Sequence, residues 1–223
     1  MRSDLFSAEY QAQPPAAVGM SLQHSRSIKY VVDGECHARQ GAMVAFRGNL
    51  QFEVKSQGVG NFLKRAVTGE GLPLMVAKGQ GEVWFAHNAQ DCFIIDLEQG
   101  DGLTINGRNV LCFDSSLGYR IKMVSGAGMA GGGLFNCEFE GQGRIGLISD
   151  GAPIVIPVSS QAPVYVDTDA VVGWSSGLSS SINRSQSLKS MFRGGSGEAF
   201  QLVLQGEGFV IVQPSEAQPA VEK

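Results

Sequence analysis

The sequence predicts a single all-β domain assembled from three diverged copies of one strand unit. Three observations favour it: 30 glycines stand against eight prolines, helix-length apolar periodicity is nearly absent, and a Gly-x-Gly motif recurs at regular spacing. The 223 residues are 43% hydrophobic and 17% charged, which suits a packed core, and all-β domains often run this long as single units. We expect one domain over residues 1–213 and a disordered tail over 214–223.

The Gly-x-Gly motif joins two strand-like runs in each unit. It occurs at Gly79-Gln80-Gly81, Gly141-Gln142-Gly143 and Gly206-Glu207-Gly208, with spacings of 62 and 65 residues. Glycine within a strand pattern indicates a bulge or a sharp bend. A nucleotide-binding glycine loop would have to open a helix, whereas strand residues follow each of these motifs. We therefore interpret the glycines as structural.

A second element recurs with similar spacing. In Arg39–Phe46, Asn106–Phe113 and Asp167–Trp174, a polar turn leads into an apolar strand that ends on an aromatic residue. The two elements together define units at about 20–88, 89–150 and 151–213. Because no unit can bury its apolar face alone, we expect them to close around a shared core as a pseudo-threefold prism or sandwich, which would also remove sheet edges.

Charge and targeting patterns exclude several classes of protein. A formal net charge of -4 gives no reason to expect a nucleic-acid partner, because such proteins usually carry a basic excess. The N-terminus does not have the pattern of a signal peptide, and no run approaches the ~20 apolar residues that span a bilayer. We expect a cytoplasmic protein. Its cysteines, Cys36, Cys92, Cys112 and Cys137, are far apart and should be reduced core residues.

Several of these motifs together resemble a known family. Gly41–Val44, the three Gly-x-Gly strands and Val164–Trp174 resemble the altered-inheritance-of-mitochondria protein twenty-four family, over about residues 22–213. The resemblance implies an all-β, double-stranded β-helix-like fold related to that of the tryptophan RNA-binding attenuator protein. Bacterial members are mostly of unknown function, and eukaryotic members are associated with the mitochondrial inner membrane. It implies no catalytic residues, and the absence of a recognisable transit segment suits a bacterial member.

The histidines and serines do not form a recognisable catalytic pattern. His24, His37 and His87 lack the short spacing of a cupin-type metal site. The nearest ligand cluster, Glu35-Cys36-His37, is equally well explained as a polar strand end. The serine-rich stretch 175–181 lacks the G-x-S-x-G elbow that exposes a nucleophile.

Asp167 and Asp169 are the remaining candidates for chemistry. Being two apart on a strand-like segment, they would project to one face and can act as an acid–base pair or a cation site. Turn-like Asn106 and Asn109 in the second unit favour a structural role instead. We predict no enzyme activity, no catalytic residue, no metal and no cofactor.

Three irregular insertions, at about 55–71, 120–133 and 182–198, contain eight of the 17 Lys and Arg residues, with Glu70 and Glu198 as their acids. A pseudo-threefold axis would bring them to one basic and partly apolar end of the molecule. We call this end the interaction face, defined by Phe62, Lys64, Arg65, Lys122, Met129, Lys189, Met191, Phe192 and Arg193.

Three interpretations of the interaction face are open. It can bind an unknown protein partner, including a second copy of the chain, because aromatic, Met and Arg residues are enriched in interface cores. It can dock on an anionic membrane at its inner, cytoplasmic face, where each basic residue contributes ~1 kcal/mol. Its apolar side chains can also pack onto the domain end as short helices.

We therefore predict a non-enzymatic binding or scaffold protein. The alternative is a small-molecule-binding β domain or an enzyme, which predicts a deep apolar pocket near the pseudo-threefold axis.

Overall fold

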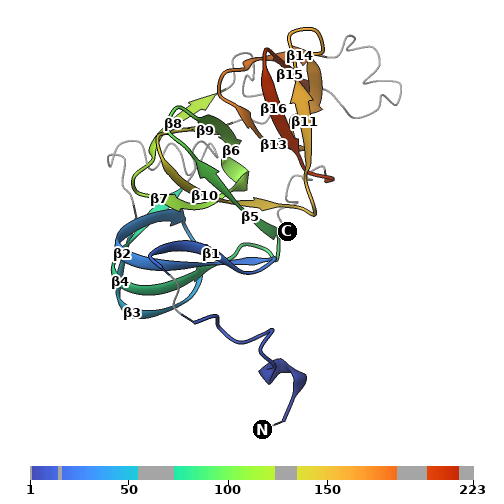
Figure 1. Ribbon diagram of the computed structural model, residues 1–223. Helices are drawn as coiled ribbons and strands as arrows, with labels where there is room; N and C mark the ends of the chain where they lie inside the picture. Colours follow the sequence, from blue (N-terminus) through green and yellow to red (C-terminus); the bar gives the residue numbers. More distant parts are fainter. Residues whose placement is uncertain (1, 15–16, 55–72, 124–134, 185–199, 216–223) are drawn as a thin grey trace, which may run out of the picture.

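The computed structural model describes residues 2–14, 17–54, 73–123, 135–184 and 200–215. Its strands are all antiparallel, and its only helical turns within these ranges are the short 3-10 helices η1 (Asp4–Phe6) and η2 (Gly107–Asn109). The predicted all-β class is confirmed. Figure 1 shows three groups of strands that follow one another along the molecule in chain order. Most of the predicted tail lies outside the described residues.

The strands divide among the three predicted units. The first unit contains β1 (Gly19–His24), β2 (Ser27–Arg39), β3 (Met43–Val54) and β4 (Leu74–Phe85). The second contains β5 (Asp91–Leu97), β6 (Gly102–Asn106), β7 (Val110–Asp114), β8 (Gly118–Met123), β9 (Phe135–Glu140) and β10 (Gly143–Ser149). The third contains β11 (Ile154–Val158), β12 (Val164–Asp167), β13 (Val171–Ser175), β14 (Ser179–Arg184), β15 (Phe200–Gln205) and β16 (Gly208–Val212).

The strands form three sheets, of which two cross a unit boundary. The first has the order β3-β4-β2-β7-β10-β5, with β1 added to β2. The second has the order β11-β16-β13-β6-β9-β8, and the third has only β12-β15-β14. Two pairings join successive units: β2 with β7, and β6 with β13. We call these pairings the two joints.

The Gly-x-Gly motifs lie between or within strands in all three units. The second and third units have the same internal pairing, and in each the motif separates two strands, β9 from β10 and β15 from β16. In the first unit β4 runs through its motif without a break. The first glycine of each motif has a positive φ, +122° at Gly79, +103° at Gly141 and +126° at Gly206, which only glycine adopts readily.

A β-bulge also recurs at one position of the repeat. One extra residue interrupts the pairing of β3 with β4, of β7 with β10 and of β13 with β16. These residues are Val44, Leu111 and Val172, each the second residue of its strand. The bulge therefore gives a residue-by-residue correspondence between β3, β7 and β13.

The predicted closed prism is not confirmed. Among the described strands, β3 and β12 do not pair with each other, so the three units are not joined into a ring. The described core has three hydrophobic clusters instead of one. The first unit's cluster includes Leu111 of the second unit, and the second unit's cluster includes Val172 of the third. The third unit's cluster is built from its own residues alone.

The N-terminal arm is fastened to the first sheet by polar contacts. The Gln13 backbone N–H donates to Gln23 Oε1 at 3.2 Å, and Gln23 Nε2 donates to the Gln11 carbonyl at 3.0 Å. The buried Lys29 ammonium donates to the carbonyls of Gln13 at 2.7 Å and Pro14 at 3.1 Å. The arm thus covers one charged group of the sheet.

Candidate functional site

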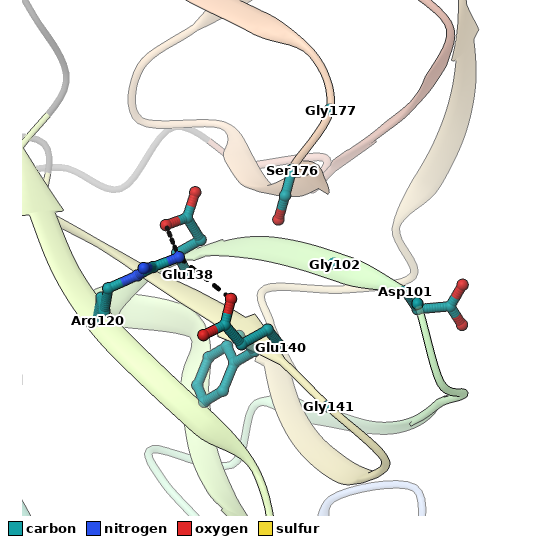
Figure 2. Close-up of a pocket in the computed structure, with 10 residues that line it drawn as sticks. Asp101, Gly102, Arg120, Glu138, Glu140, Gly141, Ser176 and Gly177 are labelled. Atoms are coloured by element: carbon teal, nitrogen blue, oxygen red, sulfur yellow. Dashed lines mark hydrogen bonds and ion pairs between the residues drawn. The ribbon is translucent and has the colours of Figure 1, made fainter.

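A polar cleft of about 440 Å³ lies beside the bend of the second unit. It is formed by the turn before β6, by β8 and β9, and by the corner between β13 and β14, so it borders two units (Figure 2). Its lining residues are Gly100, Asp101, Gly102, Arg120, Glu138, Phe139, Glu140, Gly141, Ser176 and Gly177.

Ion pairs dominate the cleft. The Arg120 guanidinium lies between two carboxylates of β9, 3.4 Å from Glu138 and 3.1 Å from Glu140 (Figure 2). Lys122 Nζ lies 2.6 Å from the same Glu138 carboxylate. These carboxylates are therefore already paired with cations of the neighbouring strand.

The remaining polar groups of the cleft serve its own turns. The Glu98 backbone N–H donates to Asp101 Oδ2 at 3.0 Å. Ser176 Oγ lies 3.4 Å from Thr104 Oγ1, and no lining residue is a histidine that would activate it. The alternative function predicts a deep apolar pocket, and the described cleft is polar, charged and shared between strand ends. It does not provide that site.

The four cysteines lie in the core as predicted. All are free and buried. Burial raises the pKa of the Cys36 thiol to about 12, of Cys92 to about 11 and of Cys137 to about 12. Burial also raises the pKa of Cys112 well above its ordinary value. Because the thiolate is the reactive form, these thiols are poor nucleophiles at neutral pH.

We expect the native protein to react with a thiol reagent at pH 8 at least ~100-fold more slowly than the urea-unfolded chain. Both the raised thiol pKa values and the burial slow the reaction. The absorbance of the thiolate released from an aromatic disulfide reagent, followed over time, measures the reaction rate in both states. Rapid reaction of even one thiol in the native state would contradict its placement in the core.

His37 and the aspartate pair have structural surroundings. His37 is buried, with its ring 4.9 Å from Phe113 and 6.0 Å from Tyr119. Asp167 Oδ1 accepts a hydrogen bond from the Asp169 backbone N–H at 2.7 Å, and the Asp169 carboxylate pairs with Arg108 at 2.7 Å. The described part of the chain contains no cluster of three or more His, Cys, Asp or Glu residues suited to a metal.

The turn at Asp167 repeats the turn at Asn106. Asn106 Oδ1 accepts from the Arg108 backbone N–H at 3.1 Å, which is the same contact one unit earlier. The correspondence of Asn106 with Asp167 supports the structural role that the sequence favoured.

Most of the interaction face lies outside the described residues. Only Lys122 is described, and its ion pair with Glu138 means that it is not a free basic group. The residues outside are Phe62, Lys64, Arg65, Met129, Lys189, Met191, Phe192 and Arg193. Among the described residues, no helix is long and apolar enough to cross a membrane.

Open edges among the described strands are a feature that the sequence did not predict. Val44 and Phe46 on β3 are 60% and 47% exposed, and Tyr165 on β12 is 57% exposed. An exposed apolar edge strand can pair with another strand. The sequence contains no signal for this exposure, because the corresponding residues of β7 and β13 are equally apolar and yet buried.

The fold defines a class of all-β protein: a row of repeated units whose strands bend at glycine pairs and whose sheets are shared between neighbours. A family model described as mitochondrial biogenesis AIM24 matches residues 26–215. The chain therefore belongs to the AIM24 family, which confirms the resemblance drawn from its motifs.

The fold is also known from a solved structure. Protein SPYM3_0169 from Streptococcus pyogenes is 22% identical, with 88% of this chain and 92% of that chain covered and a TM-score of 0.71. At this identity the similarity supports the fold alone. No curated protein matches the chain.

Proposed function

We propose that this chain is a non-enzymatic binding or scaffold protein that acts in the cytoplasm, through contact of its interaction face with a protein partner. The observation that supports this proposal is that the three insertions connect the strands of equivalent hairpins. The insertions follow β3, β8 and β14, and the flanking residues pair as Val54 with Met75, Met123 with Phe135, and Arg184 with Phe200. Their aromatic and Met residues are thus attached at equivalent positions of successive units.

Charge favours a protein over an anionic membrane as the partner. Arg120 and Lys122 were two of the eight basic residues counted for the insertions, and both pair with the β9 carboxylates Glu138 and Glu140. Basic residues that already pair with carboxylates contribute little to the attraction of a surface to anionic lipid. Apolar and aromatic residues remain as the anchors of a protein contact.

The test places a photoactivatable phenylalanine analogue at position 62 or 192 of the full chain in cells. We expect irradiation to give a discrete adduct from both positions, and Lys64→Glu combined with Arg65→Glu to leave most of it, since the anchors are apolar. The analogue at exposed Asp96 is the control and should give no discrete adduct.

Flotation with liposomes separates the membrane alternative. We expect the purified protein to float neither with phosphatidylcholine vesicles nor with vesicles containing phosphatidylserine. If it floats only with the anionic vesicles, and a variant with Lys64→Glu, Arg65→Glu, Lys189→Glu and Arg193→Glu does not, the partner is a membrane. Absence of both adducts and flotation would reject the interaction face altogether.

A further inference from the structure

The third sheet is half of a repeated pattern. The first two sheets correspond strand by strand, one unit apart: β5-β10-β7-β2-β4-β3 matches β11-β16-β13-β6-β9-β8. The third sheet, β12-β15-β14, matches only the last three positions of this order. The three strands missing from it would come from the unit after the third. Their counterparts in the first unit are the N-terminal part of β2, the C-terminal part of β4 and the N-terminal part of β3, with the outer edge of β3 open.

The two joints predict the register of a third. In the first joint His37 lies opposite Phe113, and in the second Thr104 lies opposite Trp174. The position of the bulge shows that Phe46 of β3 corresponds to Phe113 of β7 and Trp174 of β13. On the partner strands, Tyr165 of β12 corresponds to His37 of β2 and Thr104 of β6. A third joint with this register pairs Tyr165 with Phe46, and the neighbouring Val166 with Ala45.

Exposure distinguishes the open edges from the joints. At the joints, Leu111 and Phe113 are 0% exposed, and Val172 and Trp174 are 1% and 3% exposed. Their counterparts on the open edge, Val44 and Phe46, are 60% and 47% exposed.

The partner strand shows the same contrast. His37 and Thr104 are 6% and 8% exposed, whereas Tyr165 is 57% exposed. Among the described strands, the chain thus carries both halves of one more joint, and neither half has a partner strand there.

We propose that the chain self-associates head to tail, with residues 43–48 of β3 in one copy adding to β12 of a second copy. This pairing would complete the third sheet as a six-stranded sheet like the second. The proposal goes beyond the proposed function and does not depend on it, because the interaction face takes no part. Backbone hydrogen bonds of the added strand supply affinity, and the apolar pairs supply register.

β3 and the third sheet lie at opposite ends of the molecule. Figure 1 shows β3 at one end and β14 and β15 of the third sheet at the other. Each copy therefore uses one edge for each neighbour, which gives a heterologous interface that closes into a ring or continues as a filament.

A side-chain hydrogen bond that is present at both joints within the chain is missing from the proposed joint. The proposed joint is therefore the weaker one. Arg39 Nε donates to the Val110 carbonyl at 3.1 Å in the first joint, and Asn106 Nδ2 donates to the Val171 carbonyl at 3.2 Å in the second. The corresponding residue of the third unit is Asp167, whose carboxylate cannot donate. Asp167→Asn restores the donor and should tighten self-association about 2- to 10-fold.

Sedimentation velocity over a concentration series tests the proposal. We expect wild type to form species larger than a monomer, and Phe46→Glu and Tyr165→Glu each to lower its affinity at least ~100-fold, because a buried charge faces an apolar residue. Mixing these two variants should give dimers and nothing larger, since each retains one intact edge. Val155→Glu is the control: Val155 is 60% exposed on the edge strand β11, outside the proposed joint, and should assemble like wild type.

Disulfide trapping tests the register without a charged variant. A mixture of F46C and Y165C should give an intermolecular disulfide on mild oxidation, whereas F46C with V155C should not. The four native thiols are buried and should not compete. The proposal is overturned if wild type stays monomeric throughout, or if the mixture yields neither dimer nor disulfide. Such a result would not affect the interaction face, which is tested separately by the photocrosslinked adducts.

Discussion

Replacing Glu82 by Ala should destabilise the protein by about 3 kcal/mol, since it leaves a buried ammonium without its counter-ion. Glu82 pairs with Lys29 and Arg47, and Lys29 is fully buried. Lys29 and Arg47 also lie over the Trp84 ring, each 5.7 Å from its centroid, so the pair is part of the packing of β4. Urea unfolding followed by tryptophan fluorescence measures the change.

Two further variants show whether the loss of stability comes from the buried unpaired charge or from the removal of any carboxylate. Asp96→Ala removes an exposed partner, 2.7 Å from Arg144, and should cost less than ~1 kcal/mol. Adding Lys29→Met to Glu82→Ala should recover much of the loss, because the uncompensated ammonium is then gone. If Glu82→Ala costs no more than Asp96→Ala, then Lys29 reaches water when its partner is removed.

The same group predicts a pH dependence. Burial alone would raise the pKa of Glu82, but hydrogen bonds from Arg47 and Lys29 outweigh it and hold this pKa below its ordinary value of 4.5. A lowered pKa in the folded state stabilises the protein above about pH 4.5 and stops doing so as the pH falls through the folded value. Unfolding free energies from pH 7 down to 3 should fall less steeply for Glu82→Gln than for wild type.

The repeat and its bends could be predicted from sequence because local chemistry determines them. A bend of a strand needs glycine, so Gly79, Gly141 and Gly206 mark it in three otherwise diverged units. Apolar runs that reach Phe46, Phe113 and Trp174 likewise mark the strand that carries the bulge, although β3 continues to Val54 beyond its run. The all-β class followed from these two signals, and the unit boundaries stay a prediction.

The arrangement of the units could not be predicted, because it depends on which edges meet. Val44, Leu111 and Val172 are alike in sequence, yet one is exposed and two are buried at joints. The expectation of a closed prism assumed that every apolar strand finds its partner within the chain. The polar cleft was also missed, since Arg120 and Glu138 come from different strands and only pairing brings them together.

Alanine substitutions at four glycines should separate the two reasons why the bend of the first unit needs glycine. Gly79 has both, a φ of +122° and a Cβ position that meets the Asn49 carbonyl of the adjacent strand. Gly34 has only the positive φ, +105°, with open space around its Cβ position. Gly81 has only the close approach, because a Cβ at this position would meet the Arg47 carbonyl of the adjacent strand. Gly177 has neither.

We expect Gly177→Ala to change the unfolding free energy by less than ~0.5 kcal/mol. Gly34→Ala should cost about 1–2 kcal/mol from backbone strain, and Gly81→Ala about 1–3 kcal/mol from overlap with β3. Gly79→Ala should cost about as much as both together, because its Cβ overlaps backbone that cannot rotate away. Equal losses for Gly79→Ala and Gly34→Ala in urea unfolding would instead mean that β3 shifts freely at the bend. The bend would then depend on backbone conformation alone and not on the contact between strands.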